Sequence, residues 1–174
     1  MTDYICDVDG TLMNVEKRVE YAKMYKKDTD RVMNWDIFLD PTVMLEYDTP
    51  NRDVVGVIKS LSNETKRGIY TVAEDVTNDD YINNIIITSA RNERHRDVTE
   101  TQLEIAGLEY DAMYLRDDGD MRPDDIVKAE LLGKIRADGY DPTIAFDDRN
   151  QVVNKWRELG INCYQVRAGD FWYD

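Results

Sequence analysis

The chain opens with Tyr4-Ile5-Cys6-Asp7-Val8-Asp9-Gly10-Thr11, a short apolar run that stops at two aspartates and a glycine. An apolar run that ends in a turn of this kind predicts a buried β-strand. Asp7 and Asp9 are two residues apart, so extended backbone would place both carboxylates on one side of the chain. The stretch therefore predicts a strand whose carboxyl end presents a pair of acids.

Four further apolar runs resemble the first, because they are continuous rather than alternating, as strands covered on both faces tend to be. They are Ile85–Thr88, Ala112–Leu115, Thr143–Phe146 and Cys163–Val166. Between the runs, apolar residues recur at helical spacing. The helical patterns span Val54–Leu61, Val98–Ile105, Val127–Ile135 and Val152–Leu159, and three are followed by a glycine suited to a C-terminal cap, Gly107, Gly139 or Gly160. This alternation predicts an α/β fold, a Rossmann-like three-layer sandwich around a central parallel sheet.

The domain organisation follows from length and from two interruptions of the pattern. A chain of 174 residues can bury one substantial core, so we expect residues 1–174 to form a single domain. Residues 14–51 separate the first strand from the first sheet-packing helix and are predicted to form a small helical cap insertion. Within it Val15, Val19 and Ala22 make one apolar row. Residues 70–83 are polar and acidic and are predicted to be a solvated loop.

The overall charge restricts the partners of this chain. There are 36 acidic against 22 basic residues, a formal net charge of −14. Because such a charge repels phosphate backbones at long range, we expect no extended nucleic-acid binding, although a local basic pocket could hold one phosphate. No apolar run is long enough for a membrane span and residues 1–11 lack a secretion signal, so we expect no membrane association and a cytoplasmic location. Cys6 and Cys163 lie in apolar runs and are expected to pack as free thiols.

Polar residues gather where the predicted strands end, which is where open α/β sheets bind their ligands. These residues are Asp7 and Asp9, Ser89 and Arg91, and Asp147 and Asp148, with Lys128 near the start of a helix that could reach the same edge. Asp7 suits the role of a nucleophile that forms an acyl-phosphate, and Asp9 suits the general acid and base beside it. Ser89 and Lys128 suit the stabilisation of charge on the phosphoryl oxygens.

Two carboxylates that face a phosphate dianion require a cation between them, and Mg²⁺ prefers oxygen ligands of this kind. We predict that Asp7 and Asp147 bind Mg²⁺ through their side chains and Asp9 through its main-chain carbonyl. Asp148 would orient a metal-bound water, and the order of Asp147 and Asp148 could be reversed.

These residues resemble the four motifs of haloacid dehalogenase-type phosphatases. The matching stretches are Asp7-Val8-Asp9-Gly10-Thr11, Ser89-Ala90-Arg91, Lys128 and Asp147-Asp148. Residues 121–128 and 146–153 further resemble the 3′-phosphatase half of bacteriophage polynucleotide kinase. The resemblance implies a Mg²⁺-dependent phosphomonoesterase that removes phosphate from nucleic-acid 3′ ends or nucleotides through an aspartyl-phosphate. No G-x-x-x-x-G-K-[ST] motif occurs within these residues, so ATP-dependent phosphorylation by this stretch is not expected.

Several alternatives stay open at this point. The chain could be a nucleotidase, a phosphatase of another small metabolite, or a non-catalytic module that binds phosphorylated ligands. The candidates for binding the substrate are Arg91, Arg122 and Arg149, with Arg94 as a further arginine. His95 is interpreted as a surface or helix-start residue. Trp35, Phe38 and Tyr47 either stack a base or pack the insertion, and packing is the favoured interpretation.

Overall fold

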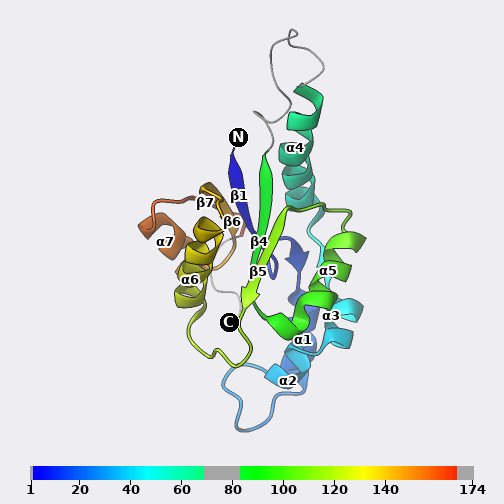
Figure 1. Cartoon of the computed structure of the whole chain (residues 1–174). Coiled ribbons are helices and arrows are strands. Elements are labelled where there is room, and N and C mark those ends of the chain that lie inside the picture. The colour runs from blue at the N-terminus through cyan, green and yellow to red at the C-terminus, as the bar shows by residue number, and fades with distance from the viewer. Residues whose placement is uncertain (1, 69–82, 168–174) are drawn as a thin grey trace.

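The structure, a computed structural model, describes residues 2–68 and 83–167, with side chains left undescribed for residues 63–68. Its centre is a five-stranded parallel sheet with the strand order β5-β4-β1-β6-β7 (Figure 1). The strands are β1 (Asp3–Asp7), β4 (Asn84–Asn92), β5 (Ala112–Arg116), β6 (Pro142–Asp147) and β7 (Asn162–Gln165). Each of the five predicted apolar runs forms one of these strands. The predicted loop at residues 70–83 lies outside the described residues, apart from Asn83.

Helices cover both faces of this sheet. They are α4 (Arg52–Gly68), α5 (Arg96–Ile105), α6 (Asp124–Ala137) and α7 (Asn150–Glu158). Ile5 of β1 packs in a core with Trp156 of α7, whereas the next residue, Cys6, packs in a second core with Ile58 of α4. Neighbouring residues of one strand thus serve opposite cores, which confirms the predicted three-layer sandwich. None of the described helices combines the length and the apolar character that crossing a membrane requires.

The predicted helix ends and thiols are also found. Gly107, Gly139 and Gly160 have positive φ angles of 65°, 97° and 82°, as left-handed C-terminal caps require. Cys6 and Cys163 are free and buried. Burial raises the pKa of Cys163 to about 12, so its thiol stays neutral at physiological pH.

Residues 14–51 leave the sheet and return to it through a two-stranded antiparallel ribbon. The ribbon consists of β2 (Met13–Asn14) and β3 (Thr49–Pro50), and between its strands lie α1 (Glu16–Met24), α2 (Trp35–Phe38) and α3 (Pro41–Tyr47). Asn34 and Asp40 start α2 and α3, because each side chain accepts hydrogen bonds from two main-chain amides of the helix that follows it. The row of Val15, Val19 and Ala22 is buried, as predicted.

Candidate active site

The turn that follows β1 depends on Gly10. This residue has a φ of +89°, and its amide donates to the carbonyl of Met13 at 2.8 Å. A Cβ added to Gly10 would lie 2.2 Å from Oδ2 of Asp148, so any side chain would clash with that carboxylate. The amide nitrogen of the Asn51 side chain donates to the carbonyls of Gly10 and Thr11, at 3.2 and 2.7 Å. The returning end of the insertion therefore holds the turn in place.

A buried ammonium group joins two of the predicted catalytic acids. Lys128 of α6 donates from Nζ to Oδ1 of Asp7 and, at 2.7 Å, to Oδ2 of Asp147. Burial alone would lower the pKa of Lys128, but Asp147 and Asp7 outweigh burial and hold that pKa above its usual value. Lys128 is therefore charged. The two acids come from the ends of β1 and β6, which are neighbours in the sheet.

Asp147 and Asp148 are adjacent in sequence but differ in their partners. Oδ1 of Asp147 accepts from the amides of Asp148 and Arg149 at 3.0 and 3.3 Å, and Oδ2 also accepts from Nε1 of Trp156 at 3.1 Å. Both oxygens of Asp148 are buried, and neither has a hydrogen-bond partner among the described residues. Burial, with the charges of Asp7 and Asp147, raises the pKa of Asp148 to about 8. Asp148 therefore requires a proton or a cation.

The acidic cluster fits a divalent cation. Carboxylate oxygens of Asp7, Asp147 and Asp148 lie within 4.8 Å of one another, and all three residues are buried. One ammonium among three carboxylates leaves negative charge in a site where water cannot screen it. Burial accordingly raises the pKa of Asp7 to about 7 despite the contact with Lys128. Mg²⁺ is a hard cation that prefers oxygen ligands, so this donor set suits it.

Asp9 faces away from that cluster, toward two arginines. Arg91 donates from Nε to Oδ2 of Asp9 at 3.0 Å and from Nη2 to Oδ1 at 2.6 Å, and Nη2 of Arg18 also contacts Oδ1. Burial raises the pKa of Asp9, but Arg18 and Arg91 outweigh burial and hold that pKa well below its usual value. Asp9 is therefore ionised. The two arginines occupy the carboxylate of Asp9. This contact is compatible with the sequence prediction, in which Asp9 binds the metal through its main-chain carbonyl.

Arg91, which the sequence predicted to bind the substrate, lies almost entirely inside the protein at the edge of a cleft that it helps to line. It is 2% exposed, and its donors are taken up inside the protein. Besides its bonds to Asp9, it donates from Nη1 to Thr99 at 3.0 Å and to Gln102 at 2.7 Å, and from Nη2 to Asp48 at 3.4 Å. An arginine has five N–H donors, and all five have a partner here. Arg91 therefore holds the carboxylate of Asp9, and its contact with substrate stays a prediction.

The other two predicted substrate arginines reach the open side of the site. Arg122 is exposed and pairs with Asp120 and Glu130, whereas Arg149 pairs with Asp124, which also contacts Arg116. Both Arg122 and Arg149 line a cleft of about 540 Å³. The same cleft is lined by Asp7, Asp9, Ser89, Lys128 and Asp147. The structure thus brings all four predicted catalytic residues to one cleft.

Sequence reasoning missed the residues that surround Asp9. Arg18 is fully buried, and its Nε lies 2.9 Å from Oδ1 of the buried Asp48. A signal for Arg18 was present, because it lies three residues after Val15 and four before Ala22, so a charge interrupts the buried side of α1. His95 does precede α5, but it is 3% exposed, so the surface interpretation was wrong.

Comparison with known proteins agrees with this geometry. The sequence profile described as the polynucleotide kinase PNKP phosphatase domain matches residues 35–171. The chain belongs to this family. It is therefore a haloacid dehalogenase-type phosphatase, as the four motifs predicted.

Solved structures resemble this phosphatase over nearly its whole length. A chain of a Pnkp1/Rnl/Hen1 complex is 28% identical with a TM-score of 0.68, and the match covers 98% of the phosphatase and 47% of that chain. In a second structure, of the Pnkp1/Rnl/Hen1 RNA repair complex, the values are 29%, 0.67, 98% and 43%. The phosphatase thus spans about half the length of these chains. A haloacid dehalogenase-like hydrolase from Streptococcus pneumoniae, 13% identical over 95% of the phosphatase and 84% of its own chain with a TM-score of 0.58, shows the fold alone.

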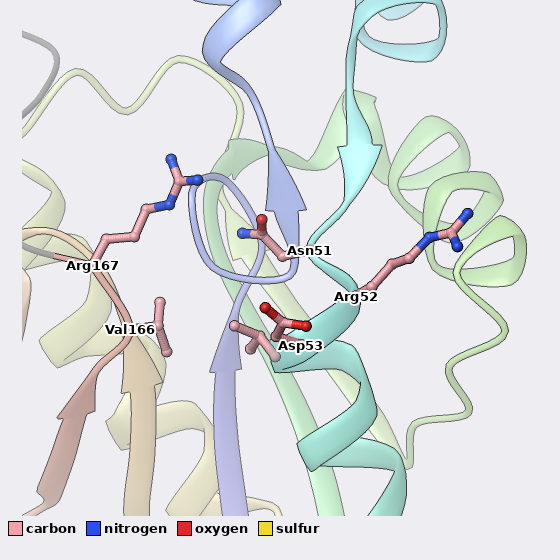
Figure 2. A pocket seen from close by; sticks show the side chains of 6 residues that line it. Asn51, Arg52, Asp53, Val166 and Arg167 are labelled. Atoms are coloured by element: carbon pink, nitrogen blue, oxygen red, sulfur yellow. The ribbon is translucent and has the colours of Figure 1, made fainter.

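The phosphatase has a second hollow, of about 250 Å³, where α4 begins beside the end of β7. Figure 2 shows that the guanidinium groups of Arg52 and Arg167 lie well apart and do not converge on one point there. Arg167 contacts Glu16 at 2.7 Å, and Asn51 is engaged with the turn after β1. This hollow therefore does not gather reactive groups as the larger cleft does.

Proposed function

We propose that this phosphatase is a Mg²⁺-dependent phosphomonoesterase that forms an aspartyl-phosphate on Asp7. The observation that carries the proposal is the buried cluster of Asp7, Lys128, Asp147 and Asp148, of which Asp7, Lys128 and Asp147 line the cleft. Phosphate esters are very slow to hydrolyse without a catalyst, so a nucleophile, an acid and a charge-stabilising cation must act together.

In the first step an oxygen of Asp7 attacks phosphorus, and the bond from phosphorus to the ester oxygen of the leaving group breaks. Lys128 holds Oδ1 of Asp7 and orients the carboxylate. Ser89, which is buried and lines the cleft, offers its hydroxyl to the phosphoryl oxygens. The product of the step is a phosphate bonded to Asp7 and a free alcohol.

Asp9 acts as the general acid in the first step and as the general base in the second. It gives a proton to the leaving oxygen in the first step and takes one from the attacking water in the second, when the bond from Asp7 to phosphorus breaks. Arg18 and Arg91 hold Asp9 ionised, which suits the proton-accepting step directly. Entry of a phosphate dianion would raise the pKa of Asp9 by repulsion between like charges, so that Asp9 takes up a proton from water before it donates that proton to the leaving oxygen.

Asp7 and Asp148 are the side chains that we assign to the metal. Among the described residues, the two buried carboxylate oxygens of Asp148 have no partner, whereas both carboxylate oxygens of Asp147 accept hydrogen bonds. The sequence analysis preferred Asp147 as the metal ligand and Asp148 as the residue that orients a metal-bound water, but it left the reverse open. We adopt the reverse. Asp147 instead orients Lys128. Bound there, Mg²⁺ would neutralise repulsion between the carboxylates and the phosphate.

Binding of Mg²⁺ should stabilise the protein more at pH 8 than at pH 6. Asp7 and Asp148 have pKa values of about 7 and about 8, so at pH 6 both carry protons that the metal must displace. Because these values exceed those of the unfolded chain, the metal-free protein loses stability as pH rises through them. Thermal unfolding with and without Mg²⁺ at pH 6, 7 and 8 measures the effect. At 100 times the Kd the expected stabilisation is about 2.7 kcal/mol.

Three substitutions sharpen this measurement. Asp148→Asn should remove most of the Mg²⁺-induced rise in Tm, whereas Asp97→Asn, at an exposed acid of α5, should leave it intact. An equal rise at all three pH values would contradict the assignment of Asp7 and Asp148. If Asp147→Asn loses the Mg²⁺-induced rise in Tm and Asp148→Asn keeps it, Asp147 rather than Asp148 binds the metal.

We infer that the substrate carries a phosphate at the 3′ end of a nucleic acid or on a nucleotide. The family supports this inference, and so does the likeness to chains of RNA repair complexes. A cleft of about 540 Å³ suits one or two nucleotides. The net charge of −14 disfavours long contacts with a polyanion, so we propose that the chain meets only the end of a strand. Residues 14–51 would act as a cap over that end.

Phosphate release from a substrate panel tests this inference. The panel contains nucleoside 3′- and 5′-monophosphates, 3′- and 5′-phosphorylated oligonucleotides and sugar phosphates, each with Mg²⁺ and each against Asp7→Asn as the blank. We expect the highest kcat/KM for 3′-phosphorylated ends. Preference for free nucleotides would indicate a nucleotidase, preference for sugar phosphates another metabolite phosphatase, and no release from any substrate a binding module.

A further inference from the structure

Two large apolar side chains are exposed on the wall of the active-site cleft. Trp35, at the start of α2, is 48% exposed, and Met121, in the segment between β5 and α6, is 92% exposed. Both line the cleft that Asp7 also lines. Figure 1 shows α2 and the segment between β5 and α6 at the same end of the molecule, the end at which β5 terminates. The catalytic cluster thus opens toward a region with apolar walls.

The side chain of Trp35 packs against the ring of Phe38. Its ring meets the ring of Phe38 edge-on, with 5.5 Å between the centroids and 85° between the planes. Phe38 is buried, and the guanidinium of Arg18 lies 4.2 Å from the centroid of its ring. An aromatic side chain that is held in place loses little conformational entropy when a flat ligand stacks on its free face.

The same contacts place Trp35 on the side of the leaving group. Arg18 contacts Asp9, the proposed proton donor to the leaving oxygen, and donates from Nη1 to the carbonyl of Phe38 at 3.0 Å. A short chain of contacts therefore connects Asp9 through Arg18 to α2. When the leaving group is the 3′ oxygen of a nucleotide, its sugar and base follow that oxygen toward α2.

We propose that Trp35 and Met121 bind the nucleobase of the nucleotide that carries the phosphate, with Trp35 as the stacking platform and Met121 as an apolar wall. This inference rests on the proposed function and specifies its substrate. Tyr47 has no part in it, because its ring stacks on Tyr21 at 4.6 Å and does not line the cleft. Stacking accepts any base, and larger rings offer more contact, so the site should prefer purines to pyrimidines without reading sequence.

A pair of substrates tests the proposal. One is a short oligonucleotide with a 3′-phosphorylated adenosine, and the other replaces that terminal adenosine with an abasic sugar bearing the same phosphate. The wild-type protein should favour the first in kcat/KM by about 10- to 100-fold, as stacking of one base on an aromatic side chain typically contributes. The difference should lie in KM, because the base does not take part in the chemistry.

The variants Trp35→Ala and Trp35→Phe identify the platform. Trp35→Ala should lose most of the preference for the base-bearing substrate, and Trp35→Phe should keep much of it. Met121→Ala should reduce the preference by a smaller factor. Its matched control is Met24→Ala, because Met24 is 77% exposed on α1 but does not line the cleft. That control should retain both the activity and the preference.

Tryptophan fluorescence provides a readout that needs no turnover. An intact nucleoside 3′-monophosphate should quench the emission of the Asp7→Asn protein, and the quenching should be lost when Trp35→Phe is added. Equal quenching in both proteins would overturn the proposal, as would equal wild-type rates on base-bearing and abasic substrates, even if 3′-phosphatase activity is confirmed. Quenching through Trp35 without phosphate release would instead support the base site and contradict the proposed function.

Discussion

Asp7→Asn is expected to abolish phosphate release, with a fall in kcat of roughly 10⁶-fold, as loss of a nucleophile typically produces. An amide cannot form the acyl-phosphate. Asp9, the nearest acid in sequence, is held by Arg18 and Arg91 and faces away from the cluster around Lys128. Release of phosphate from the preferred substrate, followed over hours, measures the residual rate.

The loss in Asp7→Asn should not arise from unfolding. Burial raises the pKa of Asp7 to about 7, so near neutral pH the folded protein already tolerates the uncharged form that asparagine resembles. Lys128 keeps its bond to Asp147 at 2.7 Å. The Tm of the metal-free variant should therefore lie close to that of the wild type, and Asp97→Asn serves as the active control. Substantial turnover in a folded Asp7→Asn protein would refute the covalent mechanism.

Lys128→Met is expected to inactivate the enzyme and to lower the free energy of unfolding of the metal-free protein by about 3–5 kcal/mol, because it leaves buried acids without a counter-charge. The ammonium of Lys128 is 2% exposed and contacts Asp7 and Asp147. Its removal leaves only repulsion between the acids of the cluster. Urea unfolding with and without Mg²⁺ measures the change, and added Mg²⁺ should recover part of the loss.

A second lysine of the same helix provides the control. Lys134 is half exposed and pairs with Asp117 at 3.0 Å, so Lys134→Met should barely change stability or activity.

The Lys128→Met variant should also become more stable as pH falls. Without the ammonium, the pKa values of the buried acids rise further, and stability from a raised pKa is lost as pH increases through it. Equal stability of the two variants would contradict the role of the buried cluster.

Local patterns in the sequence were sufficient for the fold and for predicting which residues meet at one edge of the sheet. The continuous apolar runs became the five strands, and the acids after Cys6 and Phe146 met at one sheet edge. This prediction succeeded because parallel strands end at a common edge, so residues that follow different strands become neighbours. Lys128 was found for the same reason, since α6 begins one turn before it on that edge.

The insertion was harder to interpret. Arg18 lies 73 positions before Arg91, and nothing in the spacing of the two shows that they share Asp9. Trp35 was one of three aromatic residues that the sequence treated alike. Only the structure separates it from Phe38, which is buried, and from Tyr47, which stacks elsewhere.

The sheet, the order of its helices and the acids at its edge can be predicted from the sequence, because they depend on periodicity and on chain topology. The side chains that hold those acids are visible only in the folded chain. Folding paired Arg91 with Asp9 and gave the carboxylate of Asp147 its hydrogen bonds, whereas the carboxylate oxygens of Asp148 have no partner among the described residues. The physical reason is that the charge and orientation of a buried carboxylate depend on groups within a few ångströms, and those groups come from distant parts of the chain.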